Sequence, residues 1–159
     1  MYKRALVPLD GSVVAETVIP FLLEIAGPLD MEVVLLRVNQ PVAPIVIEGA
    51  RSVQVEDLEA RRIDAEEYLA PIAVELRARG VRVDTRVRRG LPAEEIVAAA
   101  KEEGADLIAM STHGRSGLGR LLFGSVAEAV LRQSDVPVFL MRASEAQVAT
   151  RAAREAVRS

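Results

Sequence analysis

The stretch that decides the fold is Met110-Ser111-Thr112-His113-Gly114-Arg115-Ser116-Gly117-Leu118-Gly119-Arg120-Leu121-Leu122-Phe123-Gly124-Ser125-Val126. A short apolar run at 107–110 opens it and predicts a buried strand, whereas residues 126–133 predict a helix. Glycine lets a backbone approach a ligand closely, and a helix N-terminus offers free N–H groups with partial positive charge. Arg115 and Arg120 add positive charge that suits a phosphate chain. The stretch therefore predicts a strand, an anion-binding loop and a helix.

Composition points to a single α/β domain. The chain has 159 residues, of which 50% are hydrophobic and only 3% aromatic. A core made of Val, Leu, Ile and Ala favours parallel strands that are covered by helices on both faces. The absence of cysteine excludes disulfides and thiolate metal sites, and a single histidine excludes a multi-histidine metal centre.

Charge and hydropathy indicate which functional classes the protein does not belong to. The net charge of −3 argues against a general nucleic-acid binder. No apolar run reaches the length of a membrane span, so we expect no membrane association. The basic start is followed by an apolar run that Asp10 interrupts, which does not fit a signal peptide. We therefore expect a soluble cytoplasmic protein.

Strands and helices alternate along the chain. Strands are predicted at residues 5–9, 32–38, 81–88, 107–110 and 136–141, and helices at 13–26, from about 55 to 79, from Pro92 to Gly104, and at 126–133. Pro20 is expected to kink the first helix. The strand at 81–88 alternates apolar and charged residues, which indicates a position at or near a sheet edge. This order predicts a doubly wound parallel sheet of five strands.

Two segments are less regular. Residues 39–53 contain Pro41, Pro44 and Gly49, and are expected to form a long loop. Residues 143–159 are rich in Ala and Arg without a clear apolar stripe, so we expect a frayed helix or a disordered tail after a domain at 1–142.

Four motifs together resemble the universal stress protein family. That family has a Gly, two residues, a second Gly, nine residues and Gly-Ser or Gly-Thr; here Gly114 is the second Gly, residues 115–123 follow, and Gly124-Ser125 closes the pattern. Ser111 stands where the first Gly is expected. The other three motifs are Val7-Pro8-Leu9-Asp10-Gly11-Ser12, Gly90-Leu91-Pro92-Ala93-Glu94-Glu95-Ile96 and Val136-Pro137-Val138-Phe139-Leu140.

The resemblance implies a fold and a ligand. The fold is a three-layer α/β/α sandwich of the adenine nucleotide alpha hydrolase type, with strand order 3-2-1-4-5. In that order the first and fourth strands are neighbours where the winding reverses, and a ligand sits at their C-terminal ends. One branch of the family binds ATP. The implied nucleotide site comprises Pro8, Leu9, Asp10, Val38, Met110, Ser111, Gly114, Arg115, Gly124, Ser125 and Val126.

The residues of this site also have structural interpretations. Asp10 precedes Gly11 and could be a turn residue, and Val38 could belong to the core. Ser125-Val126-Ala127-Glu128 fits a capping box, in which the hydroxyl satisfies the helix end. A side chain at Ser111 narrows the approach to the sugar or phosphate, but its hydroxyl can itself form hydrogen bonds.

Two enzymatic or signalling alternatives fit poorly. His113 could form a triad with Asp10 and Ser125 or Ser111, yet no nucleophile elbow accompanies it, and ordering of the loop is the simpler role. A receiver domain would need an acceptor Asp after the third strand, where Arg88 and Arg89 stand.

The sequence thus predicts an ATP-binding regulatory protein with slow or no hydrolysis. Adenine would lie near Pro8, Leu9, Val38 and Met110, ribose near Asp10, and Mg²⁺ would be carried mainly by the phosphates. The alternative is an interaction module of the same fold that binds no nucleotide. We also predict a homodimer through the strand at 136–141, because an apolar edge strand invites pairing and many members of the family dimerise there.

Overall fold

The computed structural model describes residues 2–41, 51–113 and 124–158. For residues 51–56 it describes the backbone alone. The strands are β1 (Arg4–Pro8), β2 (Glu32–Asn39), β3 (Arg82–Arg89), β4 (Leu107–His113) and β5 (Val138–Ala143). The helices are α1 (Val13–Glu16), α2 (Val18–Ala26), α3 (Arg51–Ala78), α4 (Pro92–Glu102), α5 (Ser125–Gln133) and α6 (Glu145–Arg158). Among these described segments, no helix is both long and apolar enough to cross a bilayer.

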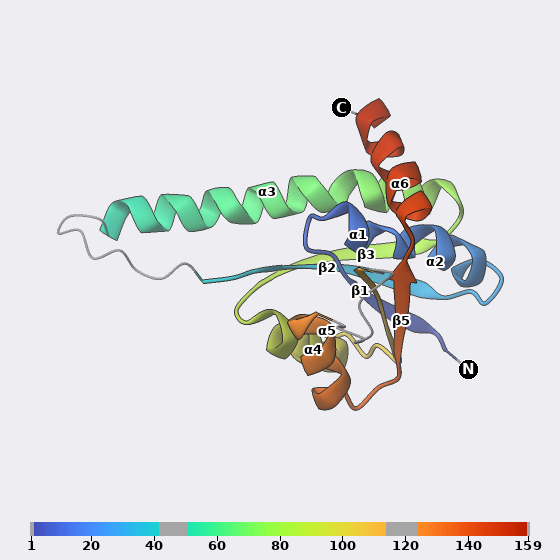
Figure 1. Ribbon diagram of the computed structural model, residues 1–159. Coiled ribbons are helices and arrows are strands. Elements are labelled where there is room, and N and C mark those ends of the chain that lie inside the picture. The colour runs from blue at the N-terminus through green and yellow to red at the C-terminus, as the bar shows by residue number, and fades with distance from the viewer. Residues whose placement is uncertain (1, 42–50, 114–123, 159) are drawn as a thin grey trace.

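All five strands are parallel and lie in the order β3-β2-β1-β4-β5. This confirms the predicted order and the edge position of the charged third strand. Helices α1, α2, α3 and α6 lie on one side of the sheet, and α4 and α5 on the other (Figure 1). Since β1 and β4 are neighbours with helices leaving to opposite faces, their C-terminal ends form the crevice in which doubly wound proteins bind ligands.

A core lies on each face of the sheet. Leu35, Leu69 and Leu76 belong to the cluster beneath α1, α2 and α3, and none of the three is exposed. Leu36 and Ile108 are equally buried in the cluster that contacts α4 and α5. Neighbouring residues Leu35 and Leu36 thus enter opposite cores, as the alternation of side chains along a strand requires.

The first helix differs from its prediction. Instead of one kinked helix over 13–26, the structure has α1 and α2, separated at Thr17. Pro20 explains the position of the break, because a proline has no N–H for the carbonyl four residues earlier and its ring clashes there. That carbonyl belongs to Glu16, the last residue of α1.

The fifth strand begins at Val138, two residues later than expected. The Ser134 hydroxyl accepts a hydrogen bond from Val136 N at 3.1 Å and donates to Val136 O at 2.8 Å, which holds these residues in a turn. Strand β4, in contrast, continues to His113, three residues beyond the predicted end.

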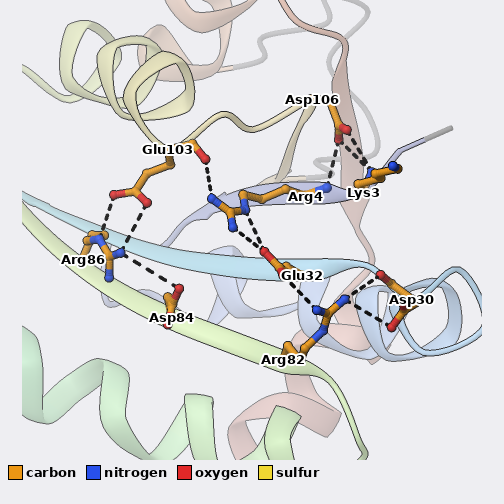
Figure 2. A network of polar contacts seen from close by, with 9 residues as sticks. All are labelled: Lys3, Arg4, Asp30, Glu32, Arg82, Asp84, Arg86, Glu103 and Asp106. Atoms are coloured by element: carbon orange, nitrogen blue, oxygen red, sulfur yellow. Dashed lines mark hydrogen bonds and ion pairs between the residues drawn. The ribbon is translucent and has the colours of Figure 1, made fainter.

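A network of charged side chains joins the N-terminal ends of the strands (Figure 2). Arg4, Glu32 and Arg82 are register partners on β1, β2 and β3. Glu32 accepts a hydrogen bond from Arg4 Nε at 2.9 Å and pairs with Arg82 Nη1 at 3.0 Å. The hydrogen bond from Arg4 holds the pKa of Glu32 below its ordinary value. These pairs lie at the end of the sheet opposite to the C-terminal ends of β1 and β4.

The C-terminal segment forms helix α6. It carries no continuous apolar stripe, and the side chain that is buried is Arg151. Arg151 contacts Glu16 of α1 and Glu75 of α3 through ion pairs. Polar anchoring therefore accounts for a docked helix where the absence of an apolar face led us to expect a frayed helix or a disordered tail.

Candidate functional site

A cavity of about 780 Å³ opens at the C-terminal ends of β1, β2 and β4. Nine of the eleven predicted site residues line it, namely Pro8, Leu9, Asp10, Val38, Met110, Ser111, Gly124, Ser125 and Val126. The other two, Gly114 and Arg115, lie outside the described residues, as does Arg120. The structure thus brings together residues that are separated by more than a hundred positions in the sequence.

The floor of the cavity is apolar. Leu9 and Met110 are 2% and 8% exposed; Leu9 directly follows β1, and Met110 ends the buried run of β4. Val38 packs against the core on the α4–α5 side and also lines the cavity, so its two predicted roles are compatible. Ile96 of α4 completes this wall. Such a surface suits a flat apolar group such as a nucleobase.

The loop after β1 is held in a fixed turn. Oδ1 of Asp10 accepts a hydrogen bond from Ser12 N at 2.9 Å, and Ser12 Oγ accepts one from Ala15 N at 3.1 Å. Ser12 thereby caps α1, as predicted. Asp10 is both the turn residue of the structural interpretation and an exposed carboxylate on the cavity wall.

Helix α5 begins at the cavity without a side-chain cap. Its N-cap is Gly124, with φ +52° and ψ 151°, and Ser125 is the first helical residue. The capping-box interpretation of Ser125 and Glu128 is therefore wrong, since the cap lies one residue earlier and makes no side-chain hydrogen bond. Glu128 pairs instead with Arg132. The N–H groups of the first turn thus have no side-chain acceptor among the described residues, which favours binding of an anion.

Ser111 contributes a buried hydroxyl to the cavity wall. Its Oγ is inaccessible to solvent and has no hydrogen-bond partner in the described part of the chain. A buried polar group without a partner is costly, and a ligand with a hydroxyl or phosphate oxygen would supply one. The serine at the family's first glycine position is therefore an available hydrogen-bonding group rather than only an obstruction.

His113 ends β4 and also lines the cavity. Within the described residues, no hydrogen bond joins it to Asp10, Ser111 or Ser125, so the triad considered from the sequence is not assembled.

The sequence interpretation missed the residues on the β2 and α3 side. Arg37, Asn39 and Arg61 line the cavity, with Gln40 beside them. One signal was available, because Arg37 is a charged residue inside an otherwise apolar parallel strand. No comparable signal marks Arg61, whose position depends on how α3 packs.

Comparisons with known proteins agree with this architecture. The model of the universal stress protein family matches residues 1–142. Universal stress protein MJ0531 of Methanocaldococcus jannaschii is 35% identical over 144 residues, which cover 89% of this chain and 83% of the relative.

Solved structures show the same fold. That of hypothetical protein MJ0577, a universal stress protein of the same organism, superposes with a TM-score of 0.73 and 32% identity, covering 91% of this chain and 99% of the other. The universal stress protein of Archaeoglobus fulgidus in complex with dAMP has a TM-score of 0.61 at 24% identity, covering 89% and 98%. The four motifs, the strand order and these matches together establish that the chain belongs to the universal stress protein family.

Proposed function

We propose that this protein binds ATP in the cavity at the ends of β1, β2 and β4 and acts as a regulatory protein with slow or no hydrolysis. One observation carries the proposal: the uncapped N-terminus of α5, entered through Gly124 at positive φ, lines the same cavity as the apolar strand ends and Asp10. Surfaces suited to an anion and to a nucleobase therefore line one cavity, as a nucleotide requires.

Each part of the nucleotide has a proposed set of contacts. Adenine lies against Pro8, Leu9, Val38 and Met110, and the ribose hydroxyls face Asp10. Gly124, Ser125 and Val126 donate to the phosphates, together with Gly114 and Arg115, and Ser111 Oγ bonds a sugar or phosphate oxygen. Mg²⁺ is carried mainly by the phosphates. The universal stress protein of Archaeoglobus fulgidus, which has the same fold, forms a complex with dAMP, and this supports an adenine nucleotide as the ligand.

Calorimetric titration with ATP, ADP, AMP and NAD, each with and without Mg²⁺, tests the proposal. We expect ATP with Mg²⁺ to bind and to raise the melting temperature, because a ligand of the native state stabilises it. NAD is the matched control, since it carries the same adenosine on a diphosphate that is blocked at its far end. The absence of both binding heat and a thermal shift at millimolar ATP would contradict the proposal.

The second candidate is an interaction module that binds no nucleotide. Ser111 at the family's first glycine position favours it, because its side chain occupies space beside the ligand. The Ser111→Gly variant separates the two: ATP binding that appears only in this variant would identify the wild-type protein as the non-binding type.

A further inference from the structure

Two arginines at the rim of the cavity carry buried N–H groups without acceptors. In Arg37 of β2 these are Nε and Nη1, and in Arg61 of α3 the atom is Nη1. Within residues 2–41, 57–113 and 124–158, neither side chain forms a hydrogen bond or an ion pair with a carboxylate. A buried charged donor without an acceptor is more costly than a neutral one, so the pair favours an external anion.

Both guanidinium groups face a second, smaller cavity that adjoins the first. It measures about 230 Å³, and Arg37, Asn39 and Arg61 line both cavities. Tyr68 and Gly11 form part of its wall, and Asp64 stands on the same wall without an ion pair to either arginine in the described structure. The two cavities therefore share a positively charged border.

Packing orders the Arg37 side chain, and a hydrogen bond fixes the backbone of Arg61. The Arg37 guanidinium lies over the Tyr68 ring, with 5.1 Å from Cζ to the ring centroid. It also packs under Gly11, where φ is +89° and any Cβ would collide with Nη1. Asn39 Nδ2 donates to the backbone oxygen of Arg61 at 3.1 Å, which ties α3 to the end of β2. The contacts of Arg37 hold its donors in place before a ligand arrives, which lowers the entropic cost of binding.

We propose that Arg37 and Arg61 form a second phosphate subsite, which binds a phosphate on the 2′ or 3′ oxygen of the ribose. The inference rests on the proposed nucleotide function. Asp10, which faces the ribose in that proposal, directly precedes Gly11, and Gly11 packs against Arg37. A phosphate on the ribose edge thus lies beside the two arginines, whereas the 5′ phosphates lie at α5. The preferred ligand class is an adenine nucleotide that is phosphorylated both at the 5′ position and at a ribose hydroxyl.

Calorimetry with AMP, adenosine 3′,5′-bisphosphate and adenosine 2′,5′-bisphosphate tests the subsite. In the wild-type protein we expect one bisphosphate to bind about tenfold or more tightly than AMP, because charge-assisted hydrogen bonds are added. In Arg61→Gln and Arg37→Gln this gain disappears, so that the ratio of the bisphosphate affinity to the AMP affinity falls to about one. Arg79→Gln, an exposed position at the end of α3 outside the cavity lining, is the matched control and keeps the gain. Arg61→Gln keeps the test decisive if Arg37→Gln fails to fold.

Equal affinities of AMP and both bisphosphates in the wild-type protein would overturn the subsite while leaving the nucleotide site intact. A gain that survives in both variants would also overturn it. If neither ATP nor AMP binds, the proposed function fails, and inorganic phosphate at constant ionic strength then tests anion recognition alone. Phosphate that stabilises the wild-type and Arg79→Gln proteins but not Arg61→Gln supports recognition by these arginines, and equal stabilisation of all three rejects it.

Discussion

Arg151 of α6 donates a hydrogen bond from Nε to Oε1 of Glu16 at 3.0 Å, although the two side chains are 1% and 0% exposed. Nη1 of Arg151 donates to Glu75 of α3 at 2.9 Å, and the Tyr68 hydroxyl donates to Oε2 of Glu16 at 3.0 Å. The two ion pairs of Arg151 therefore join α6, which follows the residues that match the family model, to α1 and α3. This relationship makes the C-terminal helix part of the folded domain.

Removal of Arg151 is expected to destabilise the protein strongly. In Arg151→Met the carboxylate of Glu16 stays buried without its arginine, and breaking a buried pair typically costs about 3–5 kcal/mol. Urea unfolding measures the change in the free energy of unfolding. The double variant Glu16→Gln/Arg151→Met should recover part of the loss, because the buried charge is gone.

Arg154→Met is the matched control for this experiment. Arg154 also pairs with Glu75, at 3.4 Å, but is 51% exposed, and exposed pairs contribute about 1 kcal/mol or less. A loss in Arg151→Met that does not exceed the loss in Arg154→Met would show that the buried pair does not anchor α6.

Stability is expected to fall as the pH rises through the titration range of Glu16. Burial and the neighbouring Glu155 carboxyl group raise the pKa of Glu16 to about 7, although Tyr68 and Arg151 act in the opposite direction. An ordinary glutamate in the unfolded chain has a pKa of 4.5, so between these values the native state binds more protons than the unfolded state. Under this condition the free energy of unfolding decreases as the pH rises.

Urea unfolding between pH 5 and pH 8, compared with Glu155→Gln, tests this pH dependence. The variant removes one cause of the raised pKa and keeps the Arg151 pair, so its stability should depend less on pH. A pH dependence identical to that of the wild-type protein, or stability that increases with pH in both, would contradict the assignment to Glu16.

Gly124→Val is expected to weaken ATP binding by about tenfold or more without unfolding the protein. The backbone at φ +52° and ψ 151° lies in a region that costs a non-glycine residue about 1–3 kcal/mol, and relief of that strain would misalign the first N–H groups of α5. No atom of the described residues lies within 4 Å of a Cβ at this position, so the fold itself should tolerate the valine.

Gly104→Val is the matched control for the Gly124 variant. Gly104 also has positive φ, +64°, and open space around a Cβ, but lies after α4 and does not line the cavity. Calorimetry should find ATP affinity reduced only in Gly124→Val. Equal affinities in the two folded variants would exclude α5 from the phosphate site.

His113→Ala is expected to leave any slow ATP hydrolysis within about tenfold of the wild-type rate. His113 lines the cavity but forms no hydrogen bond with Asp10, Ser111 or Ser125 in the described structure. A general base typically contributes roughly 10²–10⁴-fold to a rate. Single-turnover phosphate release measures the effect, and a loss beyond that limit would assign His113 a catalytic role.

A homodimer through β5 remains our prediction. Strand β5 is an edge strand, and the ion pairs that α6 forms in the described structure join it to α1 and α3. A charge on an edge strand blocks pairing with another chain, so Met141→Lys should be monomeric by light scattering. Val74 lies on α3 and is 62% exposed, so Val74→Lys is the control and should remain dimeric. A wild-type protein that is monomeric at every concentration would rule out the dimer.

Local sequence patterns predicted most of the elements, and the family resemblance predicted most of the residues that line the cavity. The apolar runs placed β1, β2 and β4, the period of two in β3 indicated an edge, and Ser12 was recognisable as the cap of α1. Nine predicted residues meet in one cavity because they lie at the carboxyl ends of parallel strands or at the start of α5, and those strand ends share one edge of the sheet. Strand order came from the family motifs, since periodicity carries no information on which strands are neighbours.

Only the tertiary structure decided the features that depend on distant partners. Arg61 faces the cavity because α3 packs beside β2. Arg151 is buried because it pairs with Glu16 and Glu75, which lie 135 and 76 residues away in the sequence. The cap of α5 falls on Gly124 rather than Ser125, since the backbone path into the helix outweighs the local capping pattern. Hydrophobic periodicity reports the environment of one segment, whereas an ion pair or a cavity wall exists only when two segments meet.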